Sequence, residues 1–165
     1  MEREAFVATA LKYLGYPATR YKGADTGNTE FGFDCSGFIS WLLNTCGYAF
    51  PVPRHCNEFF DSFGIRIDDQ FREAGDLVFF SFRSKGQYPD HMGILISRDE
   101  FIHSPGKDGK VICVDKLMQK TITPDSQAAQ IYSVNPIGFK RITIAHGRWN
   151  QPFLTEKGYV PNLQR

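Results

Sequence analysis

Several features that mark whole classes of protein are absent from this sequence. Its 165 residues include only four cysteines, and no two of them form a Cys-x-x-Cys pair, so the chain has neither a paired zinc-ligand spacing nor a disulfide framework. Lysine and arginine total 19 against 18 for aspartate and glutamate, so the formal net charge of +1 gives no reason to expect a nucleic-acid partner. No apolar run approaches the length of a membrane span.

The start of the chain also lacks a recognisable targeting signal. Met1-Glu2-Arg3-Glu4 has no cationic segment that leads into an apolar one, so we expect no signal peptide. Three places of action stay open on this ground: recycling inside the cell, the cell envelope, and export as an effector. The length predicts one domain over 1–165, with a core at about 5–142 and an irregular extension over 143–165. We also expect the protein to be a monomer.

Helical periodicity is concentrated in the first part of the chain. The mostly apolar stretch that follows Asp34 predicts a buried helix, because Asp34 is a good N-cap and Gly47 fits the position that ends a helix. An amphipathic pattern precedes it, separated by a segment rich in Gly, Asp, Thr and Asn that reads as a loop. The predicted helices are 3–14, 35–46 and 55–63, and the loop is 16–33.

The pattern changes from about residue 75 to short runs rich in β-branched and aromatic residues. Glycine, proline and charged turns separate these runs, which is typical of strands joined by short connections. Short connections favour an antiparallel sheet, and helices followed by strands predict an α+β domain with its helices packed on one side. The predicted strands are 77–82, 92–97, 100–103, 111–115 and 137–142.

Cys35 is the first candidate for chemistry. It lies in Phe33-Asp34-Cys35-Ser36-Gly37-Phe38, where the predicted buried helix begins. A free thiol has a pKa of roughly 8.5, and the N–H groups and dipole at a helix start would lower it, as would an adjacent imidazolium. This position therefore predicts a nucleophilic thiolate, with the Cys35 backbone N–H as one donor to an oxyanion.

Two histidines lie on the predicted strands. His91 opens one apolar run and His103 closes another, 12 residues later. Paired antiparallel strands would set both side chains side by side on one face. His91 could then act as the base toward Cys35, while His103 orients the His91 ring. Either histidine alone is more often structural, but the combination with Cys35 predicts a thiol hydrolase.

The remaining cysteines and histidines have simpler interpretations. Cys46 and Cys113 read as small buried apolar side chains, and a Cys46–Cys56 disulfide stays open. His55 and His146 lie in loop-like sequence and are interpreted as surface or structural residues. Because Cys46, His55 and Cys56 lack the paired spacing of a zinc knuckle, we expect no metal and no organic cofactor.

Five short motifs occur in a characteristic order. They are Phe33-Asp34-Cys35-Ser36-Gly37-Phe38, Pro53-Arg54, Gly75-Asp76-Leu77-Val78-Phe79-Phe80, His91-Met92-Gly93-Ile94 and Phe101-Ile102-His103-Ser104. In this order and spacing the motifs resemble those of the NlpC-type cell-wall cysteine peptidases, and the resemblance covers roughly residues 5–142.

The resemblance implies a papain-like α+β fold, with N-terminal helices packed on a central antiparallel sheet and the nucleophile at a helix N-terminus. It implies the same three catalytic roles: Cys35 as nucleophile, His91 as general base and acid, and His103 as the orienting residue. Members of that family hydrolyse peptidoglycan stem peptides without a cofactor, usually at the bond between γ-D-glutamate and the diamino acid.

The resemblance also implies a set of substrate-binding residues: Tyr21, Asp34, Ser36 and Arg54. In such enzymes the residues flanking the cysteine and an upstream tyrosine bind the N-terminal part of the substrate. The carboxylate of Asp34 could pair with a free α-amine, and it could also serve as the helix N-cap. The segment His55-Cys56-Asn57-Glu58 departs from the hydroxyl residues and glutamine that the family commonly has there, so the pocket floor is expected to differ.

Two alternatives to a peptidase stay open. An amidase or acyltransferase would keep the acyl-thioester and change the acceptor, although related transferases tend to place His before Cys in the chain. A non-catalytic cell-wall-binding module would keep the fold, although the presence of both Cys35 and His91 argues against it.

Overall fold

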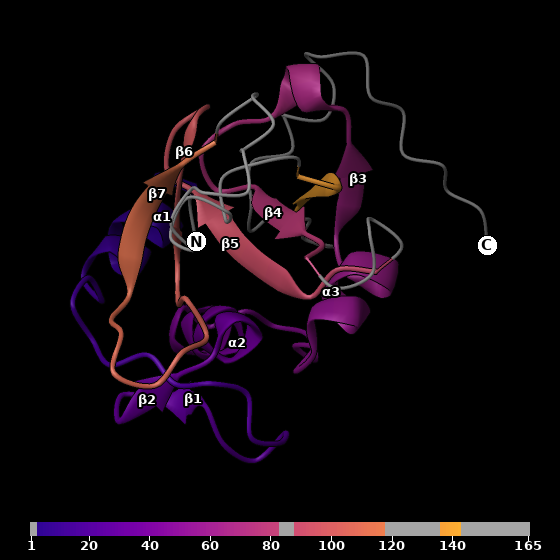
Figure 1. Cartoon of the computed structure of the whole chain (residues 1–165). Helices are drawn as coiled ribbons and strands as arrows, with labels where there is room; N and C mark the ends of the chain where they lie inside the picture. Colours follow the sequence, from indigo (N-terminus) through magenta and orange to yellow (C-terminus); the bar gives the residue numbers. More distant parts are fainter. Residues whose placement is uncertain (1–2, 83–87, 118–135, 143–165) are drawn as a thin grey trace.

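The helices of the computed structural model come before most of its strands (Figure 1), and the structure describes residues 3–82, 88–117 and 136–142. None of the helices within these ranges has the length and apolar character needed to cross a bilayer. The helices are α1 (Arg3–Leu11), α2 (Cys35–Thr45), α3 (Cys56–Ser62) and the short 3-10 helix η1 (Asp69–Phe71). The strands are β1 (Asn28–Thr29), β2 (Gly32–Phe33), β3 (Ile65–Ile67), β4 (Leu77–Phe80), β5 (His91–Leu95), β6 (Glu100–His103), β7 (Cys113–Lys116) and β8 (Gly138–Arg141).

Six strands form one sheet in the order β3-β8-β4-β5-β6-β7, and every pairing in it is antiparallel. Strands β4, β5, β6 and β7 follow one another in both sequence and space, as short connections require. β8 returns from later in the chain to lie between β3 and β4. This arrangement confirms the predicted α+β class and the antiparallel sheet.

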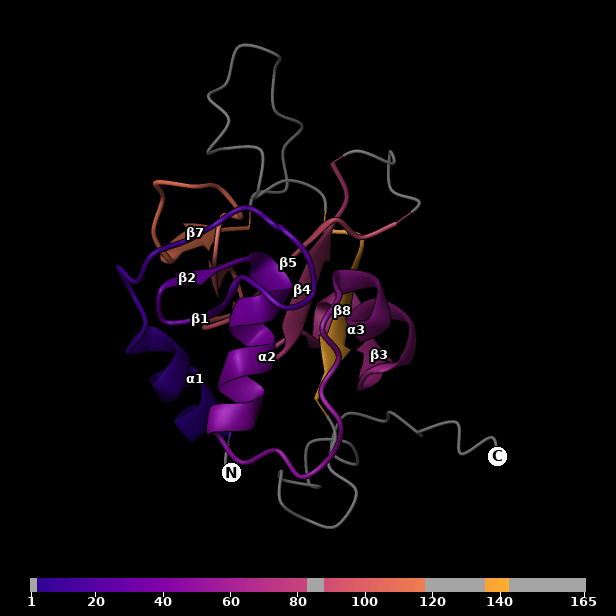
Figure 2. The same cartoon turned by 90° about the horizontal axis from the view of Figure 1, so that it is seen from below.

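The helices cover one face of this sheet. Figure 2 shows α2 in front of the strands, with α1 to its left and α3 to its right. Residues alternate between two apolar clusters along β4: Leu77 and Phe79 join the helices, while Val78 and Phe80 join a smaller cluster on the opposite face. The alternation of side chains along a strand explains why a fully apolar run was needed here, since both faces of β4 are buried.

Helix α2 forms where the sequence predicts it. The side chain of Asp34 accepts a hydrogen bond from the Gly37 N–H at 2.8 Å, which caps the helix N-terminus. Phe38 and Leu42 lie on its buried side in the main cluster. Gly47 follows the helix with a φ of 71°, a conformation that glycine adopts without strain. These features set where α2 begins and ends, and the helix packs against β5.

Three predictions about the fold need correction. The first helix ends at Leu11 and continues as turns, and the predicted loop contains the two-residue strands β1 and β2. Strand β3 was missed because it has only three residues. The predicted extension over 143–165 lies outside the described residues.

Candidate active site

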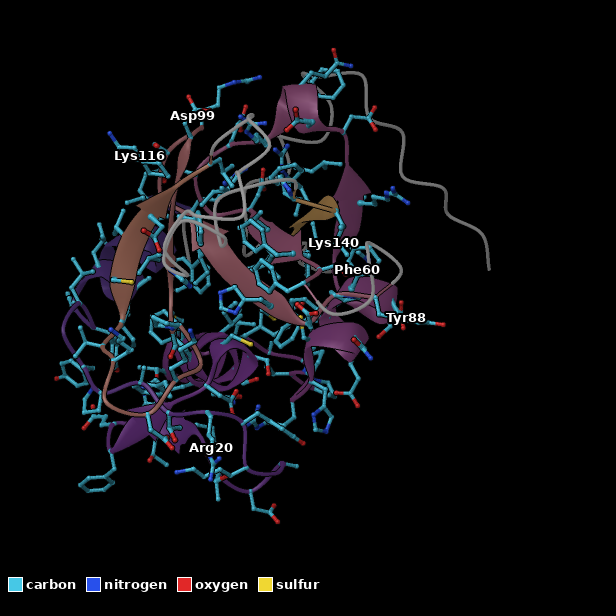
Figure 3. The ribbon with its side chains drawn as sticks, in the orientation of Figure 1. Arg20, Phe60, Tyr88, Asp99, Lys116 and Lys140 are labelled. Carbon is cyan, nitrogen blue, oxygen red and sulfur yellow. The ribbon has the colours of Figure 1, made fainter. Side chains whose placement is uncertain are left out.

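A cavity of about 550 Å³ lies beside the N-terminus of α2, and its lining includes both Cys35 and His91. Three of the predicted substrate-binding residues, Tyr21, Asp34 and Ser36, also line it. Arg20 stands at its rim, and Figure 3 shows this residue at the end of the molecule near β1 and β2. The structure therefore brings most of the predicted site residues to one hollow.

Cys35 is the first residue of α2 and remains partly exposed. Burial of its sulfur and the nearby Asp34 carboxylate raise the pKa of Cys35 to about 12, although hydrogen bonding from the backbone N–H groups of Met92 and Ser36 acts in the opposite direction. The predicted lowering of this pKa is thus wrong for the resting protein. The thiol is protonated at neutral pH, and it needs a base when it attacks.

His91 is the first residue of β5 and is almost fully buried. Its Nε2 lies 2.7 Å from Nδ1 of His103, so it can act on the thiol only through Nδ1. Burial, followed by the neighbouring His103 ring, holds the pKa of His91 well below its usual range. A ring that stays neutral at physiological pH is ready to accept a proton.

His103 stands behind His91 and does not appear in the cavity lining. Its Nε2 lies 2.8 Å from Oδ2 of Asp115. Because that carboxylate accepts a hydrogen bond from Nε2–H of His103, the Nδ1 of His103 must accept a hydrogen bond from Nε2–H of His91. This chain of hydrogen bonds leaves a lone pair on Nδ1 of His91, which is the tautomer that a base requires.

Sequence reasoning missed Asp115. It was assigned only to the end of a predicted strand, and neither its face nor its register was considered. In the structure β6 and β7 pair with His103 opposite Cys113, and Asp115 lies two residues further along the same face. The alternation of side chains on a hairpin is therefore the signal that could have identified this residue.

Arg54 lies behind Asp34 and outside the lining of the cavity. Its guanidinium bonds both carboxylate oxygens of Asp34, at 3.1 and 2.5 Å, and also donates to the Ser36 hydroxyl at 3.1 Å. It also donates to backbone carbonyls of the loop before α2, and it is not part of the cavity lining. We propose that Arg54 positions Asp34 and Ser36, while its predicted role in substrate binding stays a prediction. An amine arriving at Asp34 would share this carboxylate with Arg54.

Three of the four residues that depart from the family motif line the cavity. His55, Cys56 and Asn57 form this part of the lining. The sequence suggested that His55 is a surface or structural residue, whereas the structure places it in the wall of the cavity. Nδ1 of His55 lies 3.4 Å from the hydroxyl of Tyr21, whose ring packs against the Arg54 guanidinium. Burial raises the pKa of Cys56 well above its usual range. All four cysteines are free thiols, so the Cys46–Cys56 bridge that the sequence left open is not formed.

Comparison with known proteins identifies the family to which the chain belongs. The NlpC/P60 family model matches residues 19–129. The chain is 34% identical over 110 residues to a gamma-D-glutamyl-L-lysine dipeptidyl-peptidase of Bacillus subtilis, an alignment that covers 66% of the chain and 34% of that protein. The chain thus spans about a third of the length of this curated relative.

Solved structures agree with this assignment. An NlpC/P60 family protein from Bacillus cereus superposes with a TM-score of 0.64 and 25% identity, over 85% of the chain and 40% of that protein. RipD from Mycobacterium tuberculosis, a non-catalytic NlpC/p60 domain protein, has the same fold, with a TM-score of 0.57 and 18% identity over 87% of the chain and 99% of that protein. Because the family model covers most of the chain and the fold agrees, this chain belongs to the NlpC/P60 family.

Proposed function

We propose that this chain is a cysteine peptidase that hydrolyses peptidoglycan stem peptides at the bond between γ-D-glutamate and the diamino acid. The observation that carries the proposal is the placement of Cys35 and His91 in one cavity, with His91 bonded to His103 and His103 bonded to Asp115. A thiol, a base and two orienting groups in series are the components that nucleophilic catalysis by cysteine requires.

The reaction would proceed in two halves. Nδ1 of His91 takes the Cys35 proton as the sulfur attacks the scissile carbonyl, and the oxyanion is stabilised by backbone N–H groups at the start of α2. His91 then protonates the leaving amine, which gives a thioester on Cys35. Water, deprotonated by the same ring nitrogen, hydrolyses the thioester and restores the thiol. Asp115 and His103 keep the proton on Nε2 of His91 throughout.

The polar lining of the cavity supports a peptide substrate with carboxylate groups. Lys107 and Arg20 contribute positive charge to the lining, although Arg20 also pairs with Asp108. Asp34 and Asp90 contribute negative charge. A γ-D-glutamyl peptide carries an α-carboxylate next to its scissile bond, and cations at the rim would attract it. The Bacillus subtilis relative is a gamma-D-glutamyl-L-lysine dipeptidyl-peptidase, which supports the same choice of substrate.

The test is digestion of defined muropeptides followed by mass spectrometry. We expect cleavage at the γ-D-glutamyl–diamino acid bond, and comparison of intact with pre-trimmed stems shows which the site prefers. Cys35→Ala serves as the inactive control, because it removes the nucleophile while the cavity can still bind peptide. Near-full turnover by Cys35→Ala would overturn the proposed mechanism, and cleavage at a different bond would overturn the substrate assignment.

Alkylation of Cys35 provides a prediction about its protonation state. Because the pKa of Cys35 is raised to about 12, the thiolate fraction in the resting protein is small below that pH and grows tenfold with each unit of pH. We expect the iodoacetamide reaction rate at Cys35, followed by peptide mass mapping, to rise through pH 9 without levelling off. The urea-unfolded chain is the control, and its thiols should level off near their ordinary pKa. A plateau below pH 8 in the folded protein would instead indicate a thiolate–imidazolium pair.

Two other functions of the same fold give different outcomes in these assays. An amidase or acyltransferase would form the same thioester, but its products would include a transferred acyl group or a different severed bond. A non-catalytic binding domain would bind muropeptides and leave them intact. RipD is a non-catalytic NlpC/p60 domain protein adapted to peptidoglycan binding. The chain of hydrogen bonds behind His91 favours the peptidase, because a binding domain has no need of a fixed imidazole tautomer.

A further inference from the structure

The outer end of the histidine chain carries three side chains whose atoms are suited to a metal ion. Nε2 of His103, Sγ of Cys113 and a carboxylate oxygen of Asp115 all lie within 4.8 Å of one another. The cluster arises from the register of the β6–β7 hairpin, because His103 pairs directly with Cys113 and Asp115 is on the same face. None of these three residues belongs to the lining of the Cys35 cavity.

The distances from Nε2 of His103 to the other two atoms are close to those in a tetrahedral zinc site. With Zn–S of about 2.3 Å and Zn–N or Zn–O of about 2.0 Å, ligand atoms lie about 3.3–3.6 Å apart. Sγ of Cys113 is 3.6 Å from Nε2 of His103, and Oδ2 of Asp115 is 2.8 Å from the same nitrogen. To reach the zinc spacing from His103, the Asp115 carboxylate must move outward by about half an ångström. Its side chain is 33% exposed, so solvent can supply a fourth ligand.

We infer that His103, Cys113 and Asp115 form a site for a zinc-like divalent cation, and that the bound ion inhibits the proposed peptidase. Imidazole, thiolate and carboxylate are the ligand types that Zn²⁺ prefers. The Nδ1 of His103 is already held by His91, so the ligand ring is oriented from behind as metal-bound histidines generally are. The inhibitory part of this inference rests on the proposed function, whereas the binding part does not.

Inhibition follows from where the protons must go. A neutral imidazole bound to the ion through Nε2 carries its proton on Nδ1, so His103 would donate to Nε2 of His91 instead of accepting from it. His91 would then carry its own proton on Nδ1, the nitrogen that has to receive the thiol proton. The two rings keep one proton each, and the Cys113 thiol releases one proton to solvent for each ion bound. Metal binding at His103 therefore reverses both tautomers and removes the base.

The binding test uses Co²⁺ as a spectroscopic probe and does not depend on activity. In a Cys35→Ser chain, which cannot bind metal through the nucleophile, we expect one equivalent of Co²⁺ with a thiolate-to-cobalt absorption band and displacement by Zn²⁺. Adding Cys113→Ser should abolish the band, whereas adding Cys46→Ser, a matched change of a partly buried cysteine on the other side of the fold, should leave it unchanged. A band that survives Cys113→Ser would overturn the site.

The inhibition test uses the peptidase assay with Zn²⁺ and a chelator. Cys113→Ser should keep most of the metal-free activity, because Nε2 of His103 is held by Asp115 at 2.8 Å, whereas Cys113 lies further from that nitrogen, at 3.6 Å, and outside the cavity lining. The variant should need at least tenfold more Zn²⁺ for half inhibition than the unchanged protein. Equal Zn²⁺ sensitivity in the two proteins would overturn the inhibitory role even if the cobalt band confirms binding. A chain that binds Co²⁺ at Cys113 but cleaves no muropeptide would overturn the proposed function and leave the metal site established.

Discussion

Asp115→Ala is expected to lower kcat on muropeptides by roughly 10²-fold while KM stays within about twofold. The loss of an outer partner of an oriented histidine commonly costs about 10–100-fold, and a wrong tautomer in a catalytic triad costs about 10⁴-fold. Asp115 accepts the Nε2–H of His103 at 2.8 Å, and this bond selects the tautomers of both rings. Without it, the inactive arrangement with a proton on Nδ1 of His91 becomes populated. Steady-state kinetics measure the effect.

Asp115→Asn keeps the shape of the side chain but changes its hydrogen-bonding groups. Its NH₂ can donate to Nε2 of His103 and so select the inactive tautomers of both rings, and we therefore expect it to lose at least as much activity as Asp115→Ala. Asp115→Asn also lacks the negative charge that stabilises the histidine chain when His91 becomes protonated. Imidazole ¹⁵N chemical shifts should show mixed tautomers for His91 in Asp115→Ala and a single tautomer in Asp115→Asn. If kcat is unaffected in Asp115→Ala, the carboxylate has no part in positioning the base.

The sequence allowed the prediction of each element long enough to show a period. Helix α2 was predicted to within a residue because a capping aspartate, a continuous apolar run and a terminal glycine all agree on its limits. Strands β4, β5 and β6 were found because their apolar runs end at clear turns. β1, β2 and β3 have two or three residues each, too few for any periodicity, so only their partners in the fold define them.

The candidate site was predictable where it depends on local position and unpredictable where it depends on neighbours across the fold. Cys35, His91 and His103 follow from a helix start and two strand ends. The pKa of Cys35 does not, because burial and the Asp34 carboxylate oppose the effect of the helix N-terminus, and the balance depends on packing that no spacing reveals. Likewise, the engagement of Asp34 by Arg54 joins positions 20 residues apart on the two sides of α2, and no local sequence pattern indicates that contact.

Asp76→Asn is expected to lower the free energy of unfolding by about 3–5 kcal/mol, the usual cost of removing one partner from a buried ion pair. Asp76 is fully buried and immediately precedes β4. Its carboxylate accepts hydrogen bonds from Arg3 at 2.9 Å, from Arg141 at 2.9 Å and from the Glu73 N–H at 2.8 Å. Because burial lowers the pKa of Arg3 while Asp76 raises it, the change would leave a buried cation without its main compensating charge.

The Asp76 carboxylate connects α1 to β8, because it bonds both Arg3 and Arg141. A loss of 3–5 kcal/mol is a large share of the roughly 5–15 kcal/mol that stabilises a typical domain, and for this size it corresponds to a fall in Tm of roughly 6–20 °C. The matched control is Asp99→Asn, because Asp99 pairs with Arg72 but its side chain is 67% exposed, and such a pair is worth about 1 kcal/mol or less. Urea unfolding of both variants measures the difference. Equal stability losses would mean that Arg3 and Arg141 find other partners, and that α1 is held to the sheet by apolar contacts alone.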